Sequence, residues 1–256
     1  MNPPSKRVKL EIETTGKGPA LVLLHSLLAE RSSFERIKPQ LAKSFRLHLV
    51  HLPGYGGSAV GSERTIEDFA DRVAAQPVFS EKPFLLGNAF GGFIATALAI
   101  RHGDKIRALV AAPAIAGFSE AARQPFKVLA AKAKQSGMAA IADAAIQRMF
   151  PPAFIAAHPG IVEERKRALD GVDTQGFANA CLAIAQMDLA GALSRIRNRT
   201  LVLVGAVDQT TPAAAARELA AGIAGAQYVE LPGCGHCPQI EQPEALVAAV
   251  RGFLAA

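Results

Sequence analysis

Three positions far apart in the chain could together carry nucleophilic catalysis, and the first lies in the stretch from Phe84 to Phe93. This stretch, FLLGNAFGGF, runs from an apolar strand through a glycine-flanked turn into a helix of small residues. Its layout is that of a nucleophile elbow, G-x-S-x-G, in which a serine projects from a strained strand-to-helix corner. The middle position is Ala89, which has no nucleophile. The functional interpretation therefore depends on what this alanine means.

Two acid–base side chains follow strands that are predicted farther along the chain. Asp208 comes after a predicted strand at 200–205, and His236 comes after one at 227–231. The carboxyl ends of parallel strands form the edge at which open α/β sheets place their sites, so we expect both near the elbow. Each alone could be an ordinary loop residue, but the order nucleophile, Asp, His is that of a serine hydrolase triad. In such a triad the histidine transfers the proton, and the aspartate holds the histidine ring in the correct orientation and tautomer.

A hydrolase of this kind also needs two backbone N–H groups that stabilise the tetrahedral oxyanion. We expect one from Phe90, directly after the elbow, and one from Leu27, in the loop after the first buried strand. His25 is expected to hold that loop in place. Neighbouring residues are expected to line the substrate pocket: Ser26, Asn88 and Cys237.

The elements that must position these residues alternate between strands and helices. Strands are predicted at 8–14, 20–25, 45–50, 106–113 and from Phe84, besides the two above, and helices at 33–43, 65–76, 212–223 and 243–254. This alternation predicts an α/β fold with a mostly parallel central sheet and helices on both faces. Residues 117–192 read as helices without strands, which is typical of a lid. We therefore expect a core of residues 1–116 and 193–256, with a helical cap at 117–192.

Composition narrows the class of protein. The 256 residues are half hydrophobic and one fifth charged, as in ordinary globular proteins, and no apolar run reaches the length of a membrane span. Met1 to Lys9 are not followed by an apolar segment, so no secretory signal is expected and the predicted location is cytoplasmic. The net charge is +6, but the basic residues are scattered and there is no Trp, which argues against nucleic-acid binding. We expect a small-molecule substrate; the sequence makes no prediction about oligomeric state.

Neither a metal nor a cofactor is expected from the remaining motifs. The three cysteines, Cys181, Cys234 and Cys237, include one C-x-x-C, but no second pair of ligands accompanies it. The loop from His51 to Ser58 is rich in glycine, yet it lacks the third glycine of G-x-G-x-x-G at the required spacing. We interpret it as a turn after a parallel strand.

These motifs together resemble those of the α/β-hydrolase-fold superfamily over essentially the whole chain. Within it, three segments resemble 3-oxoadipate enol-lactonases and related ester and lactone hydrolases: Met149 to Phe154, Gly176 to Asp188, and Ile240 to Pro243. The chain departs from the usual pattern at His25-Ser-Leu-Leu, at His51 and in having no Trp. The resemblance implies Arg148 as a lid residue that binds a substrate carboxylate, with Phe150 beside it. A solvated lid arginine is the alternative.

Ala89 allows two explanations. In the first, the chain is a serine-type hydrolase of a small carboxylic ester or lactone, present as an inactive Ser→Ala variant. In the second, Ala89 is native, and His236 with Asp208 acts as a base in a lyase or cofactor-free oxygenase, or the pocket binds a ligand without turnover. A meta-cleavage-type C–C bond hydrolase is a further alternative, because such enzymes carry Gly-Asn-Ser at the elbow, where this chain has Gly87-Asn88-Ala89. We favour the first explanation because the rest of the G-x-S-x-G machinery is retained.

Overall fold

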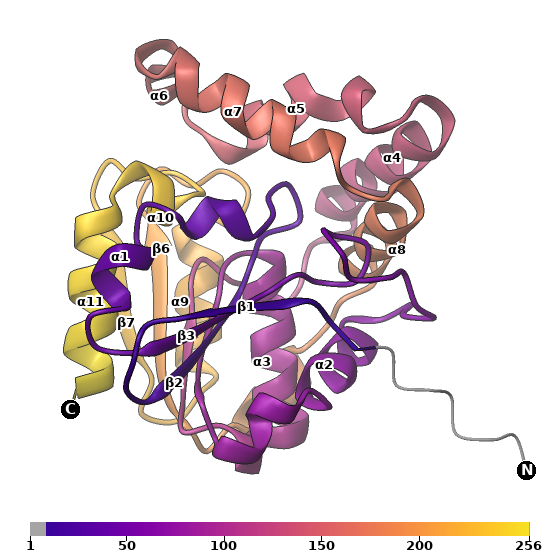
Figure 1. Cartoon of the computed structure of the whole chain (residues 1–256). Coiled ribbons are helices and arrows are strands. Elements are labelled where there is room, and N and C mark those ends of the chain that lie inside the picture. The colour runs from indigo at the N-terminus through magenta and orange to yellow at the C-terminus, as the bar shows by residue number, and fades with distance from the viewer. Residues whose placement is uncertain (1–8, 256) are drawn as a thin grey trace, which may run out of the picture.

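A seven-stranded sheet forms the centre of the computed structural model, which describes residues 9–255 (Figure 1). The strand order is β1-β3-β2-β4-β5-β6-β7; β1 is antiparallel to β3, and the other pairs are parallel. The predicted mostly parallel sheet is thus confirmed. Residues 1–8, on which the predictions about a secretory signal and the start of the first strand fall, lie outside the described residues. The strands are β1 (Ile12–Thr15), β2 (Ala20–Leu24), β3 (Arg46–Val50), β4 (Phe84–Gly87), β5 (Ala108–Ala111), β6 (Arg199–Gly205) and β7 (Gln227–Leu231).

Helices cover both faces of this sheet, as the alternating pattern predicts. Side chains of β2 alternate between two buried apolar clusters, with Val22 and Leu24 in one and Leu21 and Leu23 in the other. A strand that is apolar at every position can bury both of its faces in this way. The first cluster includes side chains of α2 (Ile66–Ala74), α3 (Phe90–His102) and α9 (Ala213–Ala221), and the second those of α1 (Lys38–Leu41) and α11 (Pro243–Ala255).

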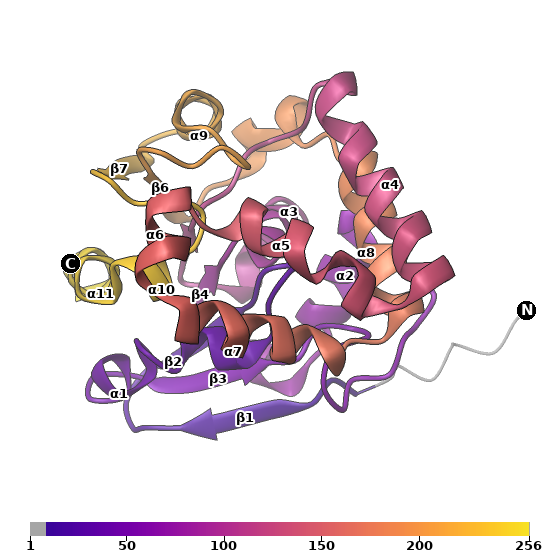
Figure 2. The same ribbon diagram turned by 90° about the horizontal axis from the view of Figure 1, so that it is seen from above.

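Five helices occupy the long connection between β5 and β6. Figures 1 and 2 show them above the carboxyl ends of the strands, with α4 and α8 side by side. The two ends of the connection meet in a bridge between Gly117 and Asp188, and the N–H of Leu189 donates to the carbonyl of Ala116 at 2.7 Å. The helices are α4 (Glu120–Ser136), α5 (Ala142–Met149), α6 (Pro152–Ala157), α7 (Pro159–Asp170) and α8 (Thr174–Ala185). No helix of the described residues is long and apolar enough to cross a membrane.

The predicted helix at 33–43 is wrong. The structure has a 3₁₀ turn at Arg31–Phe34 and only one helical turn, α1. Pro39 accounts for the difference, because proline has no N–H to donate and its ring clashes with the carbonyl four residues earlier. The helix α2, in contrast, begins as predicted: Thr65 caps it, accepting from the N–H of Asp68 while the Asp68 carboxylate accepts from the N–H of Thr65.

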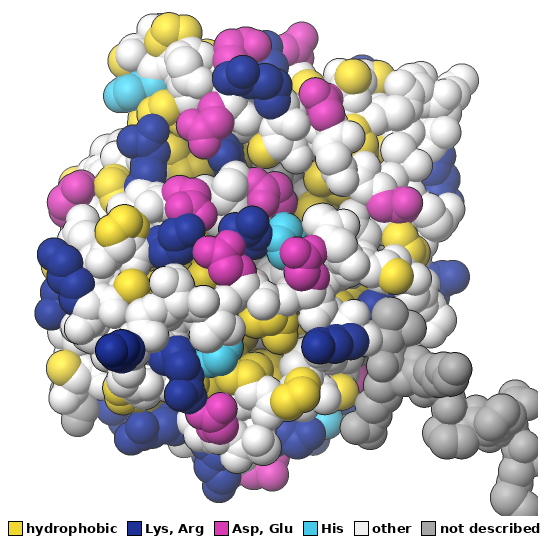
Figure 3. Space-filling view, viewed as in Figure 1, with side chains coloured by type: hydrophobic (Ala, Val, Ile, Leu, Met, Phe, Trp, Pro, Cys, Tyr) yellow, Lys and Arg dark blue, Asp and Glu magenta, His cyan; other side chains and the backbone are white. Residues whose placement is uncertain are grey.

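The surface carries both signs of charge. On the face seen in Figure 3, lysine and arginine side chains are interspersed with aspartate and glutamate. The surface includes exposed or half-exposed ion pairs, such as Arg46 with Glu81 and Lys38 with Glu35. Pairs of this kind contribute little to stability, about 0–1 kcal/mol each.

Tight packing of α3 against β2 gives a first testable prediction. A β-carbon on Gly91 would clash with the carbonyl oxygen of Leu24, whereas one on Gly252, in α11, would meet no atom within 4 Å. We expect Gly91→Ala to lower the free energy of unfolding by about 1–3 kcal/mol or more. Gly252→Ala, the control, should raise it by up to about 1 kcal/mol, since alanine is the better helix former. Urea unfolding measures both, and equal stability of the two variants would contradict the prediction.

Candidate active site

The elbow at Ala89 has the strained geometry that its glycine-flanked sequence predicts. Ala89 lies between β4 and α3 with φ 49° and ψ −110°, a region that residues with a β-carbon rarely adopt. Its N–H lies 3.1 Å from the carbonyl oxygen of Ala112 and 3.0 Å from that of Pro113, both at the end of β5. A β-carbon on Gly87 would clash with the carbonyl of Gly91, so the corner needs glycine on both sides. The chain therefore turns sharply and presents the side chain of residue 89 at the sheet edge.

Asp208 and His236 meet at this same edge. The Nδ1 atom of His236 lies 2.8 Å from Oδ2 of Asp208, and both residues are buried. The other oxygen of Asp208 accepts from the N–H groups of Thr210 and Thr211 at 2.8 and 2.9 Å. The hydroxyl of Thr211 also donates to Oδ2, at 2.5 Å. Four donors thus fix the carboxylate, and the pairing of Asp208 with His236 agrees with the sequence prediction.

These contacts determine the charge and tautomer of the pair. Burial by itself would raise the pKa of Asp208, but the attraction of His236 and the hydrogen bonds from His236 and Thr211 outweigh it and hold that pKa below its ordinary value. An ionised Asp208 can only accept, so Nδ1 of His236 carries the proton that it donates to Oδ2. The other ring nitrogen, Nε2, is left free to act as a base, and His236 lines the cavity beside Ala89.

Residue 89 and His236 face one small cavity beneath the helices of the long connection. The centre of a water molecule can occupy about 20 Å³ of it, which is room for about one water. Four predicted site residues besides Ala89 and His236 line it: Ser26, Leu27, Phe90 and Arg148. The remaining walls come mainly from apolar side chains: Leu28, Phe93, Phe118, Phe126, Ile184 and Thr210.

Three residues that we expected in the pocket lie elsewhere. The side-chain amide of Asn88 donates to the carbonyl of Ala112 at 2.9 Å and accepts from Gln239 at 3.1 Å, so it points away from the cavity. Phe150 stacks on Phe154, with ring centroids 4.8 Å apart. Cys237 is fully buried at the start of α10 (Pro238–Glu241). None of the three lines the cavity: Asn88 and Phe150 contact other residues, and Cys237 belongs to a buried apolar cluster.

The loop after β2 is held by His25, as we expected. The ring donates from Nδ1 to the carbonyl of Ser26 at 2.9 Å and accepts at Nε2 from the N–H of Leu52 at 3.1 Å. Burial lowers the pKa of His25 to about 4, so the ring is neutral at physiological pH. The hydroxyl of Tyr55 donates to the carbonyl of Leu27 at 2.7 Å. In the described part of the chain, no acceptor pairs with the N–H of Leu27 or that of Phe90.

Arg148 brings a positive charge to an otherwise largely apolar cavity. It lies in the last turn of α5, and its guanidinium carbon is 4.9 Å from the ring centroid of Phe126. Thr210 donates to the carbonyl of Arg148 at 2.9 Å, which ties α5 to the loop after β6. Among the described residues, no carboxylate lies within ion-pair distance of this guanidinium. The charge is therefore available to a ligand.

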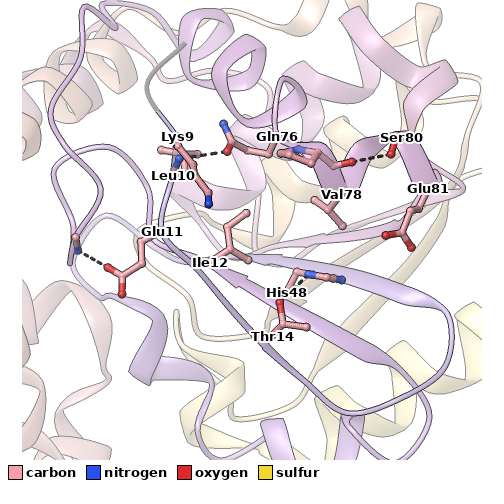
Figure 4. A pocket seen from close by; sticks show the side chains of 12 residues that line it. Lys9, Leu10, Glu11, Ile12, Thr14, His48, Gln76, Val78, Ser80 and Glu81 are labelled. Atoms are coloured by element: carbon pink, nitrogen blue, oxygen red, sulfur yellow. Dashed lines mark hydrogen bonds between the residues drawn. The ribbon is translucent and has the colours of Figure 1, made fainter. Parts of the chain in front are cut away.

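A larger hollow on the other side of the molecule offers no comparable chemistry. This groove of about 710 Å³ runs beside β1 and the segment Pro77–Glu81 (Figure 4). Several of its polar side chains already have partners: Gln76 accepts from the N–H of Leu10 at 3.2 Å, and Thr14 bonds His48 at 3.1 Å. The sequence had singled out none of these residues. The pairing of a base with an elbow occurs instead in the smaller cavity.

The sequence did not indicate the mostly apolar walls of the cavity, nor two polar side chains that bond Asp208 and Asn88, Thr211 and Gln239. Thr211 had a weak local signal, since a hydroxyl three residues after Asp208 can bond back to it, as in a short turn. Gln239 had none, because its partner Asn88 is 151 residues away.

The low pKa of His25 predicts a loss of stability in mild acid. In the unfolded chain His25 binds a proton below its ordinary pKa of 6.5. In the folded chain it stays neutral until the pH falls to about 4. At about 1.36 kcal/mol per pKa unit, the folded state should lose up to about 3 kcal/mol over that range. Urea unfolding at several pH values measures the slope. His25→Gln should make the slope shallower, whereas His158→Gln, at an exposed position, should not; equal slopes in both variants would refute this origin.

Comparison with known proteins assigns the chain to a family. A pimeloyl-[acyl-carrier protein] methyl ester esterase from Chromobacterium violaceum is 29% identical, with 96% of this chain and 98% of that protein covered. A 3-oxoadipate enol-lactonase from Acinetobacter baylyi is 28% identical, covering 96% and 93%. The crystal structure of the enol-lactonase from Burkholderia xenovorans superposes with a TM-score of 0.89, 30% identity and 96% coverage of both chains. The sequence pattern of the alpha/beta hydrolase family matches residues 21–250, and the chain belongs to that family.

Proposed function

We propose that the cavity beside Ala89 is the active site of a serine-type hydrolase of small carboxylic esters or lactones, and that this chain lacks only the serine. The observation that carries the proposal is the strained corner, which presents residue 89 to the cavity shared with the His236–Asp208 pair. The names of the relatives, an ester esterase and enol-lactonases, support the choice of bond.

With a serine at position 89, each residue has a defined part in the reaction. His236 takes the hydroxyl proton at Nε2 as the serine oxygen attacks the substrate carbonyl carbon. The N–H groups of Leu27 and Phe90 hydrogen-bond the oxyanion that forms. His236 then gives the proton to the departing alkoxide, and a water molecule repeats the sequence on the acyl-enzyme. Asp208 stays ionised and holds the imidazole throughout.

With alanine at position 89, the chain keeps the pocket but loses the covalent step. Removing the serine of such a triad lowers kcat by about 10⁶ while binding survives. A left-handed backbone costs about 1–3 kcal/mol, and a methyl group gains no chemistry from it. A mechanism in which His236 acts as a base without a nucleophile would not require a strained backbone at residue 89. This argument favours a serine as the residue for which the elbow is built.

We further propose that the substrate carries a carboxylate and that residues 117–192 act as a cap over it. Arg148 supplies a cation without a carboxylate partner in the described chain, and arginine binds carboxylates through two parallel hydrogen bonds. The connection helices and the residues that flank them contribute several walls of the cavity: Phe118, Phe126, Arg148 and Ile184. Because the cavity has room for only about one water, substrate binding would require these helices to shift.

Restoring the nucleophile is the direct test of the hydrolase. Ala89→Ser should hydrolyse p-nitrophenyl esters or lactones far faster than the present chain, by up to about 10⁶-fold in kcat. A further His236→Ala change should remove this activity, whereas His158→Ala, at an exposed histidine, should not. If the serine variant is inert on esters, lactones, amides and vinylogous diketones, the proposal is wrong. Turnover that depends on His236 in the unchanged chain would instead indicate a base mechanism.

The role of Arg148 is tested by comparing charged and neutral substrates in the Ala89→Ser chain. Arg148→Met should raise KM for a p-nitrophenyl ester with a free distal carboxylate by about 10–100-fold, because one charge-assisted contact is lost. KM for p-nitrophenyl butyrate should change by less than about twofold, since a neutral chain makes no such contact. Lys132→Met removes an exposed cap cation and serves as the control. An equal effect on both substrates would show that Arg148 only supports the cap.

A further inference from the structure

The short helix α10 connects the turn that carries His236 to the elbow. Gln239, in this helix, is fully buried, and its side-chain N–H donates to the side-chain oxygen of Asn88 at 3.1 Å. The other end of the Asn88 amide donates to the carbonyl of Ala112, which fixes the direction of both amides. One pair of side chains thus joins the ends of β4 and β5 to the turn after β7.

The bond from Gln239 is not explained by stability alone. Its side-chain oxygen is buried, and no group in the described part of the chain donates to it. An unmatched buried acceptor costs more free energy than one neutral hydrogen bond returns, so an apolar side chain of similar size would be at least as stabilising. What an apolar side chain could not do is tie the turn to Asn88.

Glu241 holds the same turn from inside. Its carboxylate accepts from the N–H of Gly235 at 2.7 Å and from the N–H of Cys237 at 2.8 Å, the two residues on either side of His236. These contacts fix the shape of the turn, but they do not fix its distance from the elbow. Among the described side chains, Gln239 is the one that bonds the turn to the residue next to Ala89.

We propose that Gln239 is a positioning residue, which through Asn88 sets the distance between the His236 imidazole and the side chain at position 89. The assignment rests on the hydrolase function proposed above. Proton transfer needs heavy atoms within hydrogen-bond reach, and a displacement of about 1 Å costs about 10²-fold in rate. Gln239 does not line the cavity, so its loss should affect the chemical step more than substrate binding.

A double-mutant cycle in the Ala89→Ser chain tests the proposal. Gln239→Met removes the hydrogen bond at similar volume, and it should lower kcat by about 10–100-fold with KM within about twofold. Asn88→Ala should also lower kcat, and the double variant should be no slower than the slower single one, because both break one connection. Gln242→Met is the matched control: it removes a side-chain amide that donates to the carbonyl of Pro232 instead of to the elbow, and kcat should not change. Unchanged kcat in Gln239→Met, or effects that simply multiply, would overturn the proposal.

A second measurement is independent of turnover and uses the chain as it stands. The proton between Nδ1 of His236 and Asp208 can be followed by NMR. Gln239→Met should shift this resonance and speed its exchange with water, whereas Gln242→Met should leave it unchanged. If the Ala89→Ser variant is inactive, the hydrolase proposal fails, and the NMR resonance alone tests the positioning role of Gln239. A shifted resonance in Gln239→Met then supports that role, and an unchanged resonance refutes it. If Ala89→Ser is active, the kinetics decide.

Discussion

The left-handed backbone of residue 89 is the constraint on which the candidate site depends. It turns the chain from β4 into α3 within one residue, so the side chain projects from the sheet edge instead of continuing along the strand. Two features maintain this unfavourable conformation: the N–H of Ala89 is taken up at the end of β5, and the glycines on either side let the backbone segments pack closely. A protein that keeps such strain without using it would lose free energy for no return.

The two charged groups beside the cavity differ in how far the protein compensates them. Asp208 is buried but receives four hydrogen bonds, so its negative charge is compensated within the protein. Arg148 lies against the face of Phe126, and among the described residues no carboxylate is within ion-pair distance of it, although Asp208 attracts it from farther away. Electrostatic attraction is stronger in a buried, largely apolar site than in water. In the proposed hydrolase, a substrate with a negative charge would therefore pair with Arg148 on one side of the cavity, while His236 and Asp208 already pair with each other on the other side.

The parts of the site that could be predicted from sequence are those with local signals. Ala89 and Asp208 each follow an apolar strand within three residues, and His236 follows the more polar strand β7 after a glycine-rich turn, so residue type, order and spacing indicated all three. Asn88 and Cys237 are expected in the pocket because they adjoin predicted site residues, and Phe150 because of the family resemblance; none of the three lines the cavity in the structure. Adjacent residues at a tight turn project in different directions. The side chain of Asn88 therefore forms hydrogen bonds with Ala112 and Gln239 instead of facing the cavity.

The sequence by itself determined the alternation of strands and helices, the glycine-flanked corner and the order of the acid–base residues. These depend on apolar periodicity and on backbone preferences that act within a few residues. Only the tertiary structure decided which distant side chains meet: His236 with Asp208, Gln239 with Asn88, and Arg148 with the cavity. Such contacts join segments that are far apart in the chain, and their geometry follows from how helices and strand ends pack.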